Sequence, residues 1–295
     1  MIFLKNILFL VVLLLSDMLY SQSFKADSYT ASEVENMNRW QLLKYDGLNV
    51  FNGVAYSYSR PFHWEKRDLY RAGATTLLVS GLYSFDQESS DYFRDQEKDI
   101  PELLRDFGWY FGSPQNNYGV TAGIYAYGLL TKDPKWRRTG VLMISSASAG
   151  GLLQQILKTI TGRARPETGF GRHEFRPFSG EAGFRSFPSG HTVLGFTTAY
   201  ALAKQFENPY VKAGIYTVGL ISPVSRLWAG AHFLTDVVLS MVITIATVEA
   251  VDRYLDTRNG YGDKRYGTGK TGQRPQKIVF NLTATSNSIG LTLNF

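Results

Sequence analysis

The chain has 295 residues, 44% of them apolar and 14% aromatic, which is enough for one large domain or two small ones with a well-filled core. It contains no cysteine, which excludes disulfides, thiolate catalysis and cysteine-ligated zinc or iron–sulfur centres. Its formal net charge of +6 favours anionic partners such as phosphates, acidic lipid surfaces or nucleic acid.

The N-terminus is typical of an export signal. Lys5 precedes an unbroken apolar run at residues 7–15, ILFLVVLLL, which is too short to span a bilayer comfortably. We therefore expect a signal peptide at residues 1–21, with an uncleaved membrane anchor as the alternative. Either form would take the chain out of the cytoplasm.

An N-terminal extension at residues 22–68 precedes a series of apolar segments. Within it, residues 48–59 have β-like character around an Asn-Gly turn signal. The apolar segments that follow have helical character and lengths. We expect helices at 69–84, 117–131, 139–158, 191–206, 211–224 and 233–254, and a charged surface helix within 85–107. The sequence thus predicts an all-α helical bundle as its main domain, at residues 69–254.

Three segments fall outside these helices. Residues 162–187 form a long loop with five Gly, five Arg and five Phe, and long loops are often functional. Its phenylalanines fit either core contacts or an apolar lid over a lipid substrate. Residues 255–276 are rich in Gly and basic residues and are typical of a linker. The tail at 277–295 alternates apolar and polar residues on both sides of Ser-Asn-Ser, which predicts a short β-hairpin.

The chain has four histidines, at positions 63, 173, 191 and 232. Asp236 follows His232 by four residues, so the two side chains would share a face if this segment is helical. A carboxylate in that position can fix the tautomer of an imidazole and raise its basicity. The segments around His63 and His173 favour structural or surface roles for those two residues.

Cationic side chains occur near the expected helix ends around His191 and His232. Lys158 and Arg165 flank the end of one apolar helix, and Arg226 precedes His232 by six residues. Three fixed cations near two histidines are suited to binding a tetrahedral oxyanion and to stabilising phosphoryl transfer. The helix that begins at the Pro-Ser-Gly-His sequence, residues 188–191, would add backbone N–H donors for the same anion.

These motifs occur in a characteristic order. K-x6-R-P at 158–166, P-S-G-H at 188–191 and S-R-x5-H-x3-D at 225–236 resemble the three-part signature of the type 2 phosphatidic acid phosphatase (PAP2) superfamily. That group includes bacterial class A acid phosphatases and vanadium haloperoxidases. The resemblance covers about residues 69–254 and implies a PAP2-type helical bundle. The N-terminal extension and the hairpin tail lie outside it.

The resemblance also implies a role for each matching residue. His232 would be the nucleophile that forms a phosphohistidine, Asp236 would orient and activate it, and His191 would be the general acid. The phosphate oxygens would be bound by Lys158, Arg165, Ser189, Gly190 and Arg226. The family's phosphatase reaction needs no metal, so we expect no cofactor. Vanadate would be an inhibitor, or a cofactor if the chain were a haloperoxidase.

The function expected from the sequence is metal-independent hydrolysis of phosphomonoesters or lipid phosphates through a phosphohistidine intermediate. One alternative is a vanadium-dependent haloperoxidase, although such enzymes generally have longer chains. The other is a non-catalytic envelope protein with a vestigial phosphate pocket, which the intact motifs disfavour. The expected partner is a phosphorylated small molecule or lipid and not nucleic acid, and the oligomeric state is left open.

The location follows from the export signal and from charges within the apolar segments. Arg71, Lys204 and Glu249 interrupt segments that would otherwise be apolar enough to cross a membrane. We expect a compact exported domain, either free in the periplasm or held peripherally on a membrane. A protein that crosses the membrane several times is the alternative.

Overall fold

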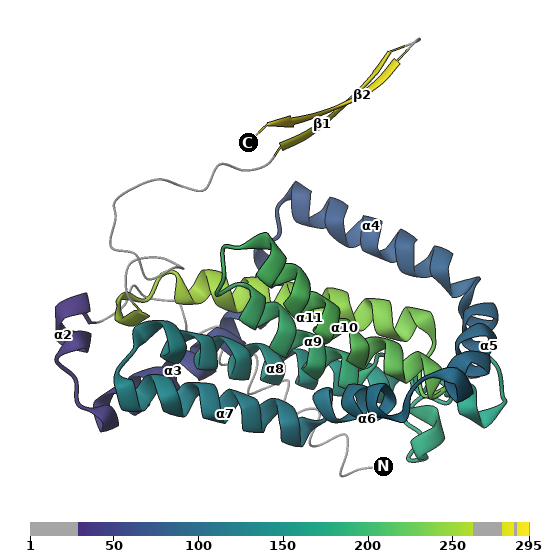
Figure 1. Ribbon diagram of the computed structural model, residues 1–295, viewed down its shortest axis with the longest axis horizontal. Helices are drawn as coiled ribbons and strands as arrows, with labels where there is room; N and C mark the ends of the chain where they lie inside the picture. Colours follow the sequence, from purple (N-terminus) through teal and green to yellow (C-terminus); the bar gives the residue numbers. More distant parts are fainter. Residues whose placement is uncertain (1–28, 262–278, 286–287, 295) are drawn as a thin grey trace.

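The computed structural model describes residues 29–261, 279–285 and 288–294, so the predicted signal peptide and most of the predicted linker lie outside it. Most of the long helices run side by side along the longest axis of the molecule, and the shorter helices lie at its two ends (Figure 1). The long helices are α3 (Arg39–Ser59), α4 (Lys66–Tyr83), α7 (Pro114–Thr131), α8 (Pro134–Thr161), α9 (Gly190–Ala203), α10 (Pro209–Trp228) and α11 (Leu234–Leu255). The shorter ones are α2 (Ala31–Glu35), α5 (Asp86–Gln96) and α6 (Glu102–Phe111). This architecture confirms the predicted all-α bundle.

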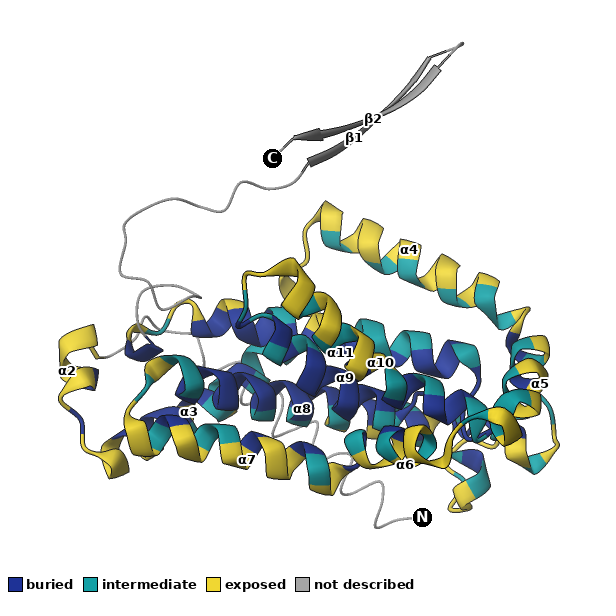
Figure 2. Cartoon of the chain, in the orientation of Figure 1, coloured by how far each residue is buried: buried dark blue, intermediate teal, exposed yellow. Residues whose placement is uncertain are grey.

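Helix α8 lies at the centre of the bundle and contacts α3, α7, α9 and α11 (Figure 2). Asp133 caps the start of the helix, because its carboxylate accepts hydrogen bonds from the backbone N–H groups of Lys135 and Trp136. Pro134 occupies the first helical position. The helix ends at Gly162, which has a left-handed backbone with φ of 57°. A Cβ atom there would lie 1.8 Å from the carbonyl oxygen of Arg176, so only glycine allows this turn into the 162–187 loop.

Small residues let α8 approach its neighbours closely. Ser145, Ser146 and Ala147 are fully buried, and a Cβ atom on Gly150 would lie 3.1 Å from the side chain of Val193 on α9. Four helices can therefore surround α8 without gaps at these positions. The central helix in turn fixes where its C-terminal end, with Lys158, meets the ends of α9 and α11.

The prediction of β-like structure at 48–59 is wrong, because this segment forms the second half of α3. Asn38 begins the helix with a capping box to Gln41. Asn52 and Gly53 form no turn, since Gly53 packs where a Cβ atom would lie 3.3 Å from Val251 and 3.4 Å from Ser145. The glycine thus serves a close contact between helices.

The N-terminal extension also contributes to the core. Leu42 and Tyr45 of α3 are buried in one cluster with Val141 of α8 and Val251 of α11. The boundary predicted at residue 69 lies inside α4, so the structure shows no break there. The charged stretch at 85–107 forms α5 and the first part of α6.

The tail forms the predicted hairpin. Strands β1 (Val279–Thr285) and β2 (Ser288–Asn294) pair in antiparallel register, with Val279 opposite Asn294. Two helices, α8 and α11, are long and apolar enough to cross a membrane by length and composition alone. In each, 56% of the most apolar stretch is buried inside the bundle.

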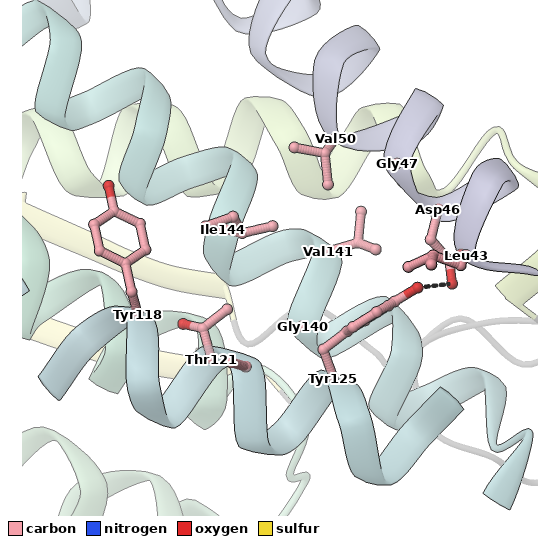
Figure 3. A pocket seen from close by; sticks show the side chains of 11 residues that line it. Leu43, Asp46, Gly47, Val50, Tyr118, Thr121, Tyr125, Gly140, Val141 and Ile144 are labelled. Atoms are coloured by element: carbon pink, nitrogen blue, oxygen red, sulfur yellow. Dashed lines mark hydrogen bonds between the residues drawn. The ribbon is translucent and has the colours of Figure 1, made fainter. Parts of the chain in front are cut away.

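A cavity of about 280 Å³ lies between α3, α7 and α8 (Figure 3). Its wall is almost entirely apolar, and it includes Val50, Val141 and Ile144. At one side the hydroxyl of Tyr125 donates to the buried Asp46 carboxylate over 2.9 Å. Val141 is about 25 Å from Lys158 along α8 at 1.5 Å per residue, so this cavity is separate from the motif residues.

Candidate active site

The motif residues come from the ends of four helices that meet at one end of the bundle. Lys158 is in the last turn of α8, Ser189 caps the start of α9, and Arg226 is in the last turn of α10. Asp236 is in the first turn of α11, and His232 lies just before that helix. The structure therefore brings together segments that are far apart in the sequence.

His232 and Asp236 meet in a different way from the one the sequence suggested. His232 is not helical, so the two do not share a helix face. Asp236 instead turns back at the start of α11 and accepts a hydrogen bond from the backbone N–H of Phe233 over 2.8 Å. This brings Oδ2 of Asp236 to 3.7 Å from Nδ1 of His232. His232 and Asp236 are therefore paired as expected, but the turn at the start of α11 brings them together and not a shared helix face.

Ser189 and Gly190 form the N-terminal end of α9. The Ser189 hydroxyl accepts from the backbone N–H of Thr192 over 3.4 Å and from its hydroxyl over 3.0 Å. It keeps its own proton for a further acceptor. A Cβ atom on Gly190 would lie 3.5 Å from Gln154, which is an ordinary contact. Packing within the protein therefore does not require a glycine at position 190. Close approach of a ligand to the backbone would require one.

The cations of the site are packed together with little opposing charge. Burial, together with the positive charges of Arg165 and Arg185, lowers the pKa of Lys158 to about 8. Burial, followed by Arg165, lowers the pKa of Arg226 to about 10. Arg165 contacts Glu167 over 3.2 Å at a partly exposed position. An incoming anion would relieve the repulsion among these groups.

Both motif histidines are neutral at pH 7 in the free protein. Burial lowers the pKa of His191 to about 3, with Arg226 and His232 adding to the effect. Burial also lowers the pKa of His232 to about 4, against the opposing influence of Asp236. Within the described part of the chain, Nε2 of His191, Nδ1 of His232 and Nε of Arg165 are buried without a hydrogen-bond partner. Nε2 of His191 and Nε of Arg165 are therefore suited to a ligand, whereas Nδ1 of His232 faces Asp236.

Several residues at the site were not found from the sequence. Arg163 donates to Asp236 over 2.7 Å, and the hydroxyl of Ser186 also donates to Asp236. Arg163 also donates to Asp86, at the start of α5, over 2.7 Å. Arg163 lies within the first motif and Ser186 lies two residues before the second, but neither position shows that the side chain points toward Asp236. Asp86 is far away in the sequence, and no sequence signal linked it to the site.

Arg185 is a further cation beside the site. It is half-buried and donates to Oε1 of Gln155 over 2.8 Å. Gln155 and Lys158 lie three residues apart on the same face of α8, which places the Arg185 guanidinium near the Lys158 ammonium. His63 and His173 lie outside the motif cluster, where they contact the carbonyl of Ser59 and the hydroxyl of Tyr83.

An apolar rim lies next to the site. The ring centroid of Trp109 on α6 is 5.9 Å from that of His191, and 47% of the Trp109 surface is exposed. In the 162–187 loop, Phe184 is buried while Phe170 and Phe178 are exposed. The loop phenylalanines therefore include both core contacts and exposed apolar groups. No cluster of three or more His, Asp or Glu side chains suited to a metal ion occurs among the described residues.

Comparisons with known proteins agree with the motifs. Residues 139–259 match the model of the PAP2 superfamily, and this range contains all three motif segments, which confirms the resemblance seen in the sequence. A lipid A 1-phosphatase of Rhizobium etli is 36% identical over 106 residues, which are 35% of this chain and 44% of that protein. The undecaprenyl-diphosphatase BcrC of Bacillus subtilis is 30% identical over 97 residues, 33% of this chain and 48% of that protein.

The chain thus spans less than half the length of these two relatives. A solved structure, LpxE of Aquifex aeolicus, is 23% identical to this chain and superposes with a TM-score of 0.40. The superposition covers 55% of this chain and 93% of the LpxE chain.

Proposed function

We propose, on the premise that residues 139–259 match the family model of the PAP2 superfamily, that the protein is a metal-independent phosphatase acting on phosphomonoesters or lipid phosphates. The observation that carries this proposal is the cluster of Lys158, Arg165 and Arg226 around His191 and His232. Fixed cations at this spacing neutralise the charge of a transferring phosphoryl group, a task that Mg²⁺ performs in many other enzymes.

The first chemical step follows from the orientation of His232. Its Nδ1 atom faces Asp236, which leaves Nε2 to attack phosphorus. The N–P bond forms as the bond from phosphorus to the leaving oxygen breaks, and His191 gives its proton to that oxygen. The positive charge left on the His232 ring is stabilised by the nearby Asp236 carboxylate. Lys158, Arg165 and Arg226 hold the other phosphate oxygens.

The second step restores the enzyme. Water gives a proton to His191 and attacks phosphorus, the N–P bond breaks, and inorganic phosphate leaves. His191 is neutral in the free protein, so it must gain its first proton with the substrate. The negative charge of a bound phosphate would offset the cations that depress the pKa of His191 and would favour that proton uptake.

A lipid phosphate is the substrate class that the surroundings support best. The Trp109 ring lies beside His191, where the leaving oxygen would exit, and the 162–187 loop, which carries Arg165, also holds exposed phenylalanines. The names of the two relatives refer to lipid A and to undecaprenyl diphosphate, both of which carry long apolar chains. We expect the protein to work in contact with a membrane after export.

The decisive experiment measures phosphate release from a soluble monoester, a lipid phosphate and a lipid diphosphate, with EDTA or vanadate present. Turnover that persists in EDTA, stops with vanadate and leaves an acid-labile phosphoenzyme in rapid-quench samples supports the proposal. Activity that returns only when a divalent metal is added contradicts it. Bromide oxidation by peroxide in the vanadate-loaded protein would instead favour a haloperoxidase.

The location needs a separate experiment. After cell fractionation and a carbonate wash, release of the protein without detergent supports an exported domain held peripherally. Retention through carbonate, together with protection of residues 131–138 from protease added on the periplasmic side, would establish the alternative that crosses the membrane several times.

A further inference from the structure

Three charged side chains form a continuous buried chain that ends at the motif carboxylate. Nη1 of Arg163 donates to Oδ1 of Asp236 over 2.7 Å, and Nη2 of Arg163 donates to Oδ2 of Asp86 over 2.7 Å. Each of the three side chains is at most 1% exposed. Asp86 precedes Asp236 by 150 positions and lies outside the 139–259 segment that matches the family.

Thr235 ties both ends of this chain to the start of α11. Its backbone N–H donates to Oδ1 of Asp86 over 2.9 Å, and its hydroxyl donates to the same carboxylate. Arg163 also donates to the Thr235 hydroxyl, over 2.9 Å. Asp86 therefore fixes the first turn of α11, the turn from which Asp236 reaches toward His232.

Aromatic rings keep water away from Arg163. Its guanidinium carbon lies 4.2 Å from the ring centroid of Phe233 and 5.0 Å from that of Tyr83. The low polarity of this surrounding strengthens the interaction of the guanidinium with each carboxylate. Its charge is thus divided between two carboxylates and not screened by solvent.

We propose that Arg163 and Asp86 are positioning residues for the phosphoryl transfer: Arg163 holds Asp236 in place, and Asp86 offsets the charge of Arg163. Asp236 then keeps the negative charge that stabilises the His232 ring when it carries the phosphoryl group. Without Asp86, Arg163 would be neutralised by Asp236 alone, and less negative charge would face His232. This inference rests on the proposed function of His232.

A buried ion pair can also serve the fold alone, and the molecule contains a matched example. At the other end of α8, Arg137 donates to Asp46 over 2.9 Å and 2.7 Å. The Asp46 side chain is 1% exposed and that of Arg137 is 3% exposed. Asp46 also accepts from the hydroxyls of Tyr125 and Tyr261. Asp46→Asn therefore removes a comparable buried charge at the end of α8 opposite to Lys158.

The test compares Asp86→Asn, Arg163→Lys, Arg163→Gln and the control Asp46→Asn in the full chain. For each, kcat and KM are measured on the lipid phosphate that the wild type turns over best, and melting temperature is measured alongside. The tautomer of His232 is read from ¹⁵N NMR of the histidine rings, with its signals assigned by their loss in His232→Ala. Activity is expressed per folded molecule.

We expect Asp86→Asn to lower kcat by about 10- to 100-fold, the size of effect that follows when a metal-bound histidine loses an outer hydrogen-bond partner. KM should change by less than about threefold, since the phosphate-binding cations stay in place. Arg163→Lys should retain more activity than Arg163→Gln, because lysine keeps the charge but lacks the planar fork that reaches both carboxylates. Asp46→Asn should lower the melting temperature and leave kcat unchanged.

In the NMR experiment, wild-type His232 should carry its proton on Nδ1, facing Asp236, and Asp86→Asn should shift population toward the Nε2–H form. If Asp86→Asn does not fold, Arg163→Lys is judged by the same two readouts. Wild-type kcat and tautomer in the folded variants would overturn the inference, as would an equal loss of kcat in Asp46→Asn. A wild type without phosphatase activity would refute the proposed function, and the tautomer shift alone would then decide this inference.

Discussion

Nδ1 of His232 lies 3.7 Å from Oδ2 of Asp236 with both side chains buried, and no hydrogen bond joins them. The Asp236 oxygens accept from Arg163, from Ser186 and from the backbone of Phe233. Asp236 is therefore held in place by other groups, and at this separation it acts on the imidazole through its charge. The nucleophile and its carboxylate can thus be altered separately.

His232→Ala should abolish turnover, because it removes the atom that takes the phosphoryl group. Asp236→Asn should lose less, by up to roughly 10,000-fold, because the nucleophile remains while its electrostatic support is gone. Steady-state kinetics and rapid-quench trapping of the phosphoenzyme measure both effects, with circular dichroism as the control for folding. Normal turnover in His232→Ala would remove this residue from its assigned role.

Lys158 should add a step to the alkaline fall of activity, beyond the loss of the proton that His191 takes up with the substrate. Its pKa of about 8 leaves it mostly charged at pH 7, and it loses its positive charge as the pH rises through that value. We therefore expect kcat/KM, which reports the free enzyme, to fall more steeply above about pH 8. A bound phosphate stabilises the charged amine, so the corresponding limb of kcat should lie at higher pH.

Lys158→Arg provides the control for this limb, because a guanidinium stays charged at this pH. The limb should then move to higher pH, even if overall activity is reduced by the change of geometry. An alkaline limb that stays at the same pH in Lys158→Arg would assign it to another group.

Gly190→Ala should separate ligand approach from folding. The added Cβ atom makes only an ordinary contact with Gln154, and alanine favours a helix more than glycine does, so the melting temperature should not fall. The methyl group would stand where a phosphate approaches the first amides of α9, and kcat/KM should drop by up to about 100-fold.

Gly151→Ala on α8 is the matched control for Gly190→Ala. A Cβ atom there would have no neighbouring atom within 4 Å, so we expect unchanged kinetics. Equal kcat/KM in the two variants would mean that ligands do not approach the backbone at Gly190.

The sequence predicts those features of the fold that depend on neighbouring residues better than those that depend on contacts between distant segments. The helices from residue 69 onward follow from local apolar patterns, and the motif order brought Lys158, Arg165, His191 and His232 into one predicted site. The same local signals failed at Gly53, where an Asn-Gly pair indicates a turn but the glycine serves contact with α8 and α11. Only tertiary packing distinguishes those two uses of glycine.

The buried partners of Asp236 could not be predicted for a related reason. Arg163 is two residues from Arg165, yet the chain turns so that Arg163 points into the protein with a side chain 1% exposed while that of Arg165 stays 28% exposed. Asp86 belongs to a segment whose composition is that of a charged surface helix. Its burial is compensated by Arg163, which lies 77 positions later, and by Thr235, which lies 149 positions later, and no local pattern indicates either partner.

Trp109→Ala should distinguish a lipid substrate from a soluble one. The exposed indole beside His191 would cover part of a lipid chain next to the leaving oxygen, and burial of an aromatic side chain contributes about 2 kcal/mol. We therefore expect KM for a long-chain lipid phosphate to rise by roughly 10- to 30-fold, while KM for a soluble monoester changes by less than about twofold. Trp40→Ala, which removes an indole that is 63% exposed on α3, is the control and should affect neither substrate. Equal changes for both substrates in Trp109→Ala would show that the indole supports His191 itself, and the argument for a lipid chain at this rim would fail.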